Sequence, residues 1–259
     1  MEVVPLTTPE EVGALVADLV EGVVRAKPEA VVGLATGSSP LPVYAELRSR
    51  HAAGRGPSYD RVTWLLLDEY VGLPPGHPQS YLATIRRELT DEVGGAAVHA
   101  PDPRPEELPL AGERYETLIA DAGGVDLQVL GIGADGHLAF NEPGSSLASR
   151  TRLKTLTERT RADNARHFGD PREVPRHVVT QGLGTILDAR RAVLVATGPG
   201  KADAVAAAVE GPLTASCPAS VLQLHRHATV VLDAPAAAGL ERLDYYREVH
   251  ASKPEWQRP

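Results

Sequence analysis

Residues 126–143 read DLQVLGIGADGHLAFNEP, a largely apolar run that passes into a glycine-rich turn carrying two acids and a histidine. The run Leu127–Leu130 has the length of a buried strand. Glycine lets the backbone approach a ligand closely. An imidazole titrates near neutral pH, and neighbouring carboxylates orient it and favour its protonated form. We therefore expect Asp135, His137 and Glu142 to perform general acid–base chemistry on a small polar substrate.

Outside this stretch, apolar runs of strand length alternate with segments of helical spacing. In residues 9–26 the apolar positions recur at helical spacing, with Thr8 as the N-cap and a proline in the first turn. Strands that are apolar throughout and alternate with helices are typical of a parallel sheet covered on both faces. We predict one α/β domain over residues 1–259, with a doubly wound, mostly parallel, Rossmann-like sheet. The predicted strands are 30–35, 62–67, 126–132, 192–197 and 228–232; the predicted helices are 9–26, 40–49, 80–89, 113–121, 178–189, 200–209 and 236–249; and 94–108 is mostly loop.

The composition limits what the protein binds and where it works. Hydrophobic residues make up 42% of the 259 residues and aromatic residues only 4%, so the core is aliphatic. A net charge of -8 argues against a nucleic-acid-binding protein, which normally shows a basic face. The single cysteine, Cys217, excludes an intrachain disulfide and a cysteine-based metal site and is typical of a reducing compartment. Because neither a secretory signal nor an apolar run of membrane-spanning length is visible, we expect a cytoplasmic protein that binds no membrane.

Four of the predicted strands are followed by residues that carry chemistry. In a parallel sheet, ligands bind beyond the carboxyl ends of the strands, so we expect these four turns to meet at one edge. The turn at residues 36–40, TGSSP, offers amides, hydroxyls and a helix dipole to an anion; a plain serine N-cap would also explain it. Lys201 follows another strand-to-helix turn and would add a positive charge for phosphate, although a solvated surface lysine is the simpler interpretation of that residue alone.

Asp68 and Glu69 follow the predicted strand 62–67. Adjacent residues on an extended segment point opposite ways, so one carboxylate can face a cleft while the other is tied to backbone or to a cation. A carboxylate at the end of a buried strand is partly desolvated, and a tuned pKa there would suit a base. The alternative is a pair of solvated acids that open a turn.

Two further questions concern metals and mobile segments. Two acids and three glycines around His137 disfavour a packed core histidine, and the lack of a second histidine at ligand spacing disfavours a metal site; we expect no metal and no other cofactor. Residues 150–176 contain seven arginines. They form either a solvated surface or part of a mobile lid, around residues 155–180, that brings an arginine onto an anionic substrate.

The chain resembles the glucosamine-6-phosphate deaminases, also called isomerases, from about residue 32 to residue 234. The resemblance rests on the motifs ATGSSP at 35–40, LDEYVGL at 67–73, GIGADGHLAFNEP at 131–143, SSLASRTR at 145–152 and LQLH at 222–225. It implies that the substrate is glucosamine 6-phosphate, that the products are fructose 6-phosphate and ammonia, and that no cofactor is needed.

The resemblance also implies a role for each candidate residue. His137 would assist opening of the pyranose ring, oriented and charge-tuned by Asp135 and Glu142. Asp68 would carry a proton from C2 toward C1 through an enol-like intermediate, after which the amine leaves C2. The residues that bind the substrate and its phosphate would be Thr36, Gly37, Ser38, Ser39, Glu69, Arg166 and Lys201.

Some members of that family are hexamers activated by N-acetylglucosamine 6-phosphate, which binds between subunits. The positions of this chain that resemble the activator site are Ser145, Arg152, Lys154 and Tyr245. The resemblance thus raises the expectation of a homo-oligomer with a phosphosugar activator. The N-terminal segment and the tail after Val249 match the family least.

Three other functions fit parts of the sequence. A 6-phosphogluconolactonase would share the fold and the Asp-Gly-His turn, but it needs no carboxylate base for C2 and lacks Phe-Asn-Glu-Pro after the histidine. A non-catalytic phosphosugar sensor would keep the 36–39 turn and could lose the acid–base residues. A deaminase of another 2-amino-sugar phosphate, such as galactosamine 6-phosphate, would differ only in contacts that a sequence does not display.

Overall fold

The structure is a computed structural model that describes residues 1–170 and 172–257, without the side chains of residues 159, 163, 166, 167 and 256. Its centre is a seven-stranded sheet in the order β1-β10-β9-β6-β2-β3-β5, in which every neighbouring pair is parallel. A second sheet holds three antiparallel strands in the order β4-β8-β7. The strands are β1 Glu2–Pro5, β2 Val31–Leu34, β3 Thr63–Leu66, β4 Asp68–Tyr70, β5 Ala97–His99, β6 Leu127–Leu130, β7 Arg152–Thr155, β8 His177–Thr180, β9 Ala192–Ala196 and β10 Ala228–Leu232.

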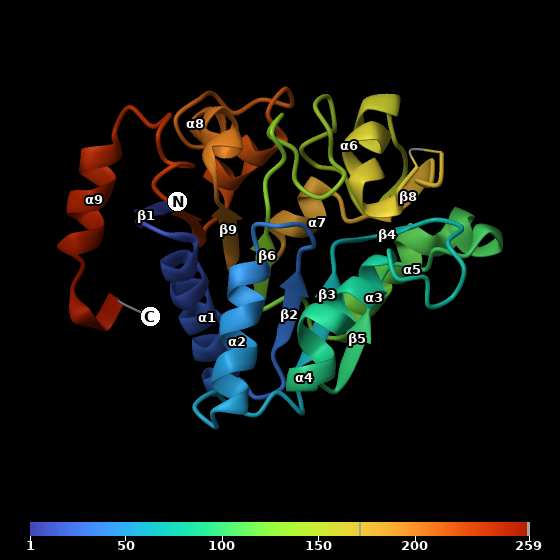
Figure 1. Cartoon of the computed structure of the whole chain (residues 1–259), viewed down its shortest axis with the longest axis horizontal. Helices are drawn as coiled ribbons and strands as arrows, with labels where there is room; N and C mark the ends of the chain where they lie inside the picture. The colour runs from blue at the N-terminus through green and yellow to red at the C-terminus, as the bar shows by residue number, and fades with distance from the viewer. Residues whose placement is uncertain (171, 258–259) are drawn as a thin grey trace.

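Helices cover both faces of the central sheet (Figure 1). Along β9, Val193 and Val195 pack in the core cluster that includes α1 and α2, whereas Leu194 packs in the cluster that includes α7 and α8. This alternation across a strand is what a doubly wound α/β fold requires, and it confirms the predicted fold class. The helices are α1 Pro9–Ala26, α2 Leu41–Ala52, α3 Tyr81–Ile85, α4 Asp91–Val93, α5 Leu108–Asp121, α6 Glu158–Phe168, α7 Leu183–Leu187, α8 Ala202–Val209 and α9 Leu243–Ala251, with a π-helix at Arg86–Thr90 and 3₁₀ turns at Pro105–Glu107, Pro199–Lys201, Pro218–Leu224 and Glu255–Gln257.

The first helix begins where the sequence predicts. The Thr8 hydroxyl accepts a hydrogen bond from the Glu11 N–H (3.2 Å), and the Glu11 carboxylate accepts one from the Thr8 N–H (3.2 Å). This reciprocal pair is a capping box, which satisfies two backbone donors that a helix start otherwise leaves unpaired. Thr8 is therefore confirmed as the N-cap of α1.

The prediction of a helix over 178–189 is wrong in its first third. The segment begins in strand β8, continues through Gly182, and becomes helical only in α7. A side chain at Gly182 would lie 2.0 Å from the Ser149 carbonyl oxygen, so the close approach of two backbones requires glycine there. Pairing with β4 and β7 overrides the local helical pattern, as tertiary context commonly does.

Three other element predictions need correction. The helix predicted over 236–249 starts only at Leu243, because the Asp233 carboxylate holds the Ala236 N–H (2.8 Å) in a turn and Ala236 and Ala237 are buried in the core. The predicted 94–108 loop contains strand β5, and strands β1, β4 and β7 were not predicted either. All four are short edge strands, whose pairing partner rather than their own pattern defines them.

The carboxyl ends of four adjacent central strands lie at one edge of the sheet. The strands β9, β6, β2 and β3 are consecutive in the sheet and all parallel. The turns that follow them, at residues 198–201, 131–143, 35–40 and 67–69, therefore leave the sheet at the same edge, as the sequence predicts. The antiparallel sheet begins at this edge too, because β4 starts at Asp68, directly after β3 and Leu67.

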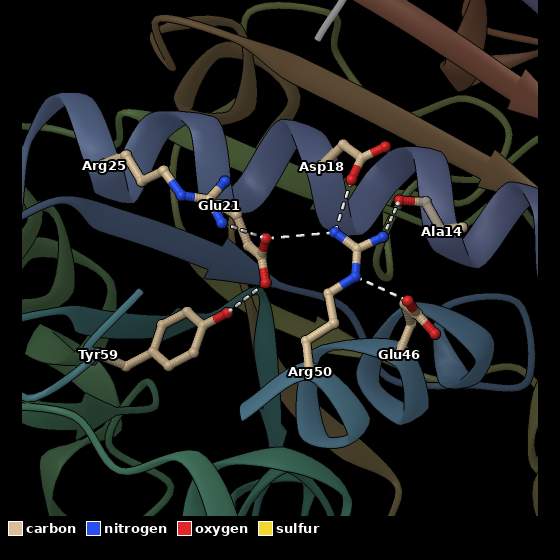
Figure 2. A network of polar contacts seen from close by, with 7 residues as sticks. All are labelled: Ala14, Asp18, Glu21, Arg25, Glu46, Arg50 and Tyr59. Atoms are coloured by element: carbon tan, nitrogen blue, oxygen red, sulfur yellow. Dashed lines mark hydrogen bonds and ion pairs between the residues drawn. The ribbon is translucent and has the colours of Figure 1, made fainter. Parts of the chain in front are cut away.

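A buried ion-pair network joins α1 to α2 (Figure 2). The Glu21 side chain is only 2% exposed, and it accepts hydrogen bonds from Arg25 (2.9 Å), Arg50 (3.2 Å) and the Tyr59 hydroxyl (3.4 Å). Arg50 also contacts Asp18 (2.6 Å) and Glu46 (2.7 Å). A buried carboxylate that keeps its cations is tolerated, whereas one that loses a partner destabilises the fold.

Replacing Arg50 with methionine is expected to lower the free energy of unfolding by about 3 kcal/mol, because Glu21 then stays buried beside the more exposed Arg25 alone. Urea unfolding at pH 7 measures the change. The matched control is Arg61→Met, because Arg61 is 70% exposed and its ion pair within the described residues is with Glu29. This control should lower the free energy of unfolding by less than about 1 kcal/mol. Equal losses in the two variants would contradict the buried-pair argument.

Candidate active site

Asp68 lies at the start of β4 and is 6% exposed. Burial, followed by the neighbouring Glu69 charge, raises the pKa of the Asp68 carboxyl from its ordinary 3.8 to about 8. No hydrogen bond from the described residues reaches this carboxyl group to stabilise its charge. A carboxyl group with a pKa near the working pH, at the ligand-binding edge of a parallel sheet, has the properties of a general base.

The Glu69 carboxylate, unlike that of Asp68, is held by hydrogen bonds, as expected for neighbouring residues that point opposite ways along a strand. It accepts hydrogen bonds from the backbone N–H groups of Tyr70 (2.8 Å), Tyr81 (2.9 Å) and Leu82 (2.9 Å). Burial raises the pKa of Glu69, and these three donors partly counter the effect. Glu69 therefore anchors the start of α3 to β4, and its contact with a substrate stays a prediction.

The turn after β6 holds His137 against Asp135. The His137 Nδ1 lies 2.6 Å from Asp135 Oδ1, and the His137 N–H donates to the same oxygen (3.2 Å). Burial opposes ionisation of Asp135, but the interactions with His137 outweigh it and lower the pKa of the Asp135 carboxyl. A side chain at Gly133 would lie 2.1 Å from His137 Cε1, so the imidazole packs directly on a glycine backbone. With Nδ1 engaged by Asp135, Nε2 is the ring nitrogen left to exchange a proton with a ligand.

Glu142 is placed differently from what the sequence indicates. The expected partner is His137, but no hydrogen bond or ion pair joins the two within the described part of the chain. Instead, the Thr160 hydroxyl of α6 donates to Glu142 Oε1, and Thr160 also bonds the Thr157 hydroxyl at the helix start (2.9 Å). Among the described residues, Asp135 is the one hydrogen-bond partner of the imidazole, and Glu142 links this turn to the segment expected to be the lid. Nothing in the sequence pattern around Thr160 points to this contact.

The 36–40 turn leaves its hydroxyl groups available. The helix α2 starts after Pro40 and has no side-chain cap, so the plain N-cap interpretation of Ser38 and Ser39 is wrong. The hydroxyls of Thr36, Ser38 and Ser39 form no hydrogen bond with any residue that the structure describes. Gly37 has φ +99°, which glycine adopts without strain.

The turn before Lys201 is held by a residue that the sequence analysis did not select. Asp233 is only 2% exposed, and its two carboxylate oxygens both accept from the Gly198 N–H of this turn, at 2.9 and 3.0 Å, while Oδ1 also accepts from the Ala236 N–H (2.8 Å). Gly198 has φ +87° and leads into the 3₁₀ turn that ends at Lys201. Asp233 directly follows the last predicted strand, and that position at the sheet edge is the signal that could have identified it.

The candidate activator residues are only partly brought together. Arg152 and Lys154 are two residues apart in β7, so both side chains lie on the same face of that strand. Ser145 is 6% exposed, and its hydroxyl has no partner within the described residues. Tyr245 lies on α9, which packs on β1 at the far end of the central sheet, well away from β8 and its neighbour β7 (Figure 1). Within one chain, Tyr245 therefore does not join the other three.

Arg152 borders a groove of about 510 Å³ between the start of α5 and β7. Its guanidinium donates to the Arg150 carbonyl oxygen (3.3 Å), and burial lowers its pKa because no carboxylate of the described chain compensates. The groove wall also contains the apolar residues Leu108, Pro109 and Leu153 and the acidic residue Glu113. An anion placed here would meet a partly desolvated cation.

The lid expected around residues 155–180 stays a prediction. Its two ends lie in strands, Thr155 in β7 and residues 177–180 in β8, where all but His177 are buried, and residues 156–170 and 172–176 lie between these strands. The α6 residue Phe168 packs edge-on to Tyr70 (5.5 Å between centroids) and stacks on His77 (5.9 Å). Arg166 lies on the same helix, but its side chain lies outside the described residues, so its predicted substrate contact stays a prediction.

Two general observations complete the description of the site. Among the side chains of the residues that the structure describes, no three of His, Cys, Asp or Glu gather where they could hold a metal ion. No helix among them combines the length and apolar character that crossing a membrane requires.

A parallel α/β sheet with acidic residues and a histidine at its carboxyl edge is typical of enzymes that act on small molecules by acid–base catalysis. The family described as glucosamine-6-phosphate isomerases/6-phosphogluconolactonase matches residues 7–231. The chain belongs to this family.

Individual relatives agree with the family match. The chain is 59% identical to a glucosamine-6-phosphate deaminase of Arthrobacter sp. (strain FB24) and 56% identical to one of Rhodococcus opacus (strain B4), in each case over 99% of both chains. A solved monomeric glucosamine-6-phosphate deaminase superposes with a TM-score of 0.89, at 37% identity, over 92% of this chain and 100% of that chain. A 6-phosphogluconolactonase from Trypanosoma brucei superposes with a TM-score of 0.74 at 20% identity, over 92% and 98% of the two chains, which shows a shared fold alone.

Proposed function

We propose that the protein is a hydrolytic glucosamine-6-phosphate deaminase, which converts glucosamine 6-phosphate and water to fructose 6-phosphate and ammonia. The observation that carries this proposal is full-length identity of 54–59% to relatives that bear this name. The buried carboxyl of Asp68 and the Asp135–His137 pair at one sheet edge supply the acid–base groups that the reaction needs. We infer that it works in the cytoplasm, in the breakdown of N-acetylglucosamine.

Substrate binding starts at the phosphate. The free hydroxyls of Thr36, Ser38 and Ser39 can donate to phosphate oxygens, and the backbone at Gly37 can approach them closely. Lys201, on the turn held by Asp233, adds a positive charge from the neighbouring region of the edge. We assign Arg166 on α6 as a further contact with the anionic substrate.

Ring opening is assigned to His137. The closed pyranose must lose the proton of its C1 hydroxyl and gain one on the ring oxygen before C2 becomes acidic. An imidazole whose Nδ1 is fixed by Asp135 presents Nε2 in a defined direction for this exchange. We assign Glu142, which follows His137 by five residues and is bound to Thr160, a supporting role in the same step.

Proton transfer along the open chain is assigned to Asp68. Its carboxylate removes the C2 proton and delivers it to C1, while O1 gains a proton and the amine nitrogen loses one, so that the aldehyde becomes a primary alcohol carbon and C2 becomes an imine. Water adds to this C2 imine, the C2–N bond breaks, and ammonia leaves with the ketone of fructose 6-phosphate as the product. Every step is a proton transfer or a hydrolysis, so these side chains suffice.

The proposed function is tested by ammonia release from glucosamine 6-phosphate. We expect steady turnover with stoichiometric fructose 6-phosphate, and no release from unphosphorylated glucosamine at the same concentration. Galactosamine 6-phosphate serves as the second substrate. Faster turnover of the galactosamine compound would reassign the substrate, and hydrolysis of 6-phosphogluconolactone without ammonia release would reassign the reaction.

We also propose that N-acetylglucosamine 6-phosphate activates a homo-oligomer, a hexamer as in some relatives, through Ser145, Arg152 and Lys154. The partly desolvated Arg152 and the groove beside it support this proposal. Because Tyr245 is far from these residues in one chain, its contribution requires a neighbouring copy.

Replacing Arg152 with alanine is expected to abolish activation and leave basal turnover near that of the unmodified protein. In the unmodified protein the activator should lower the substrate KM by at least about 5-fold, the low end of ordinary allosteric coupling. The measurement is initial rate against substrate concentration with and without activator, and Arg87→Ala, an exposed arginine paired with Glu88, is the control. Activation that survives in Arg152→Ala would contradict the assignment.

A further inference from the structure

Gln181 lies directly after β8 and is fully buried. Its backbone N–H donates to the Leu67 carbonyl oxygen (2.7 Å), and its side-chain Nε2 donates to the Leu66 carbonyl oxygen (3.1 Å). These are the two residues that precede Asp68. One residue therefore binds both peptide groups that lead into the proposed base.

The same residue also binds the turn that carries the imidazole. The Gln181 carbonyl oxygen accepts a hydrogen bond from Asn141 Nδ2 (2.8 Å), and that nitrogen also donates to the Leu138 carbonyl oxygen (2.9 Å). Asn141 is fully buried as well. It closes the tight turn that follows His137, in which Ala139 has φ +52°, the single positive φ of a non-glycine residue within the described chain.

A parallel connection runs through Thr180. Its hydroxyl accepts a hydrogen bond from the Phe140 N–H (3.2 Å), and its backbone pairs with Asp68 in the antiparallel sheet. The dipeptide Thr180–Gln181 thus contacts the segment before Asp68 on one side and the turn after His137 on the other. The rings of Tyr70 and Phe140 also pack between the two segments, with 6.0 Å between their centroids.

The chemistry of the contacts requires amide nitrogens. Gln181 Nε2 and Asn141 Nδ2 donate to backbone carbonyl oxygens, and the Gln181 side chain also bonds the Tyr115 side chain, so a carboxylate or an apolar side chain cannot replace either group. The amide oxygens, Gln181 Oε1 and Asn141 Oδ1, find no donor among the described residues. A buried acceptor without a donor destabilises the fold, and such groups in native proteins call for an explanation beyond stability.

The position of the Asp68 backbone matters because the carboxyl group itself is not held by hydrogen bonds from the described residues. The path of the backbone therefore determines where the carboxyl lies. Acid–base transfer between two groups tolerates little displacement, and a shift of about 1 Å can reduce a rate by about 100-fold.

We propose that Gln181, with Asn141, is a positioning residue that sets the separation between the strand end carrying Asp68 and the turn carrying His137. The inference rests on the proposed function, because it assigns those two side chains to one reaction. Gln181 itself touches neither the reacting atoms nor the catalytic side chains.

The test replaces Gln181 with methionine, which keeps the volume and removes the Nε2 donor. The matched control is Gln128→Met in β6. Gln128 is also buried (1% exposed), its Nε2 also donates to a backbone oxygen (Val129, 2.9 Å), and its Oε1 also has no partner in the described chain. It contacts neither catalytic segment, so it reports the general effect of losing a buried amide.

We expect Gln181→Met to lower kcat by about 30- to 100-fold, with KM for glucosamine 6-phosphate changed by less than about threefold, because the phosphate turn is not part of the contact set. Gln128→Met should retain kcat within a factor of about three. Equal kcat in Gln181→Met and the unmodified protein, or equal losses in the two variants, would overturn the proposal.

A second readout does not depend on the reaction. In Gln181→Met, the rate of amide hydrogen exchange should rise in both residues 66–70 and residues 138–142. In Gln128→Met, it should rise in neither segment. A rise in exchange confined to one segment would overturn the positioning proposal whether or not the protein releases ammonia. Absence of ammonia release would instead reject the proposed function. If Gln181→Met does not fold, Thr180→Val removes the acceptor for Phe140 and should raise exchange in both segments; unchanged exchange in that folded variant would overturn the proposal.

Discussion

Replacing Asp68 with asparagine is expected to lower kcat by about 10³- to 10⁴-fold, the upper range for loss of a general base. The amide keeps the shape of the side chain but cannot accept the C2 proton. Binding should be nearly unaffected, because the phosphate turn at 36–40 and the Lys201 turn are separate from β4. Of the substitutions considered, this one should have the largest effect on turnover.

The experiment separates catalysis from binding. Ammonia release gives kcat, and calorimetric titration with the amino-alditol 6-phosphate, which lacks the aldehyde and cannot react, gives the dissociation constant. The dissociation constant should stay within about threefold of that of the unmodified protein, since uniform binding contacts are untouched. Turnover near the unmodified level would show that Asp68 is not the base.

The same substitution should alter how stability depends on pH. The folded protein holds the Asp68 proton up to about pH 8, whereas a carboxyl with the ordinary pKa of 3.8 releases it near pH 4. Between these values the folded state binds more protons, so this group lowers the free energy of unfolding as the pH rises. Asparagine has no such proton. Asp68→Asn should therefore gain stability over the unmodified protein from pH 5 to pH 8 in urea unfolding, and an advantage that shrinks with pH would contradict the raised pKa.

Replacing His137 with glutamine is expected to lower turnover of glucosamine 6-phosphate by about 10²- to 10³-fold, because the general acid–base group for ring opening is lost. An open-chain analogue without the C5 hydroxyl cannot close the pyranose ring and skips this step. Its turnover should fall by less than about tenfold. The two substrates therefore isolate the role of the imidazole from the proton transfer by Asp68.

The measurement compares the ratio of kcat/KM for the two substrates in both proteins. His51→Gln, an exposed histidine on α2 outside the site, is the control and should leave both values unchanged. Equal slowing of the cyclic and open-chain substrates would remove the ring-opening role from His137. It would favour instead a role for His137 in holding the turn through its contact with Asp135.

Much of the fold follows from local patterns in the chain. The runs around Leu65, Val129, Leu194 and Val230 are short and apolar on both faces, a pattern that only a covered parallel sheet satisfies, and all four are central strands. The sequence also places the acid and histidine turns at the strand ends. It fails for 178–189, since the strand in that segment exists only because β4 and β7 lie on either side of it.

By itself, the sequence determined the parallel sheet and the residue types at its carboxyl edge, and it indicated that a carboxylate at 68–69 is partly desolvated, because each follows from spacing between near neighbours. Only the tertiary structure decided that Glu69 rather than Asp68 accepts the backbone hydrogen bonds, that Glu142 meets Thr160 rather than His137, and that Gln181 joins the segments that carry Asp68 and His137. The Gln181 side chain bonds to Leu66 across 115 positions of the chain. Such contacts depend on how strands from distant segments pair, and periodicity in one segment contains no information about its distant partner.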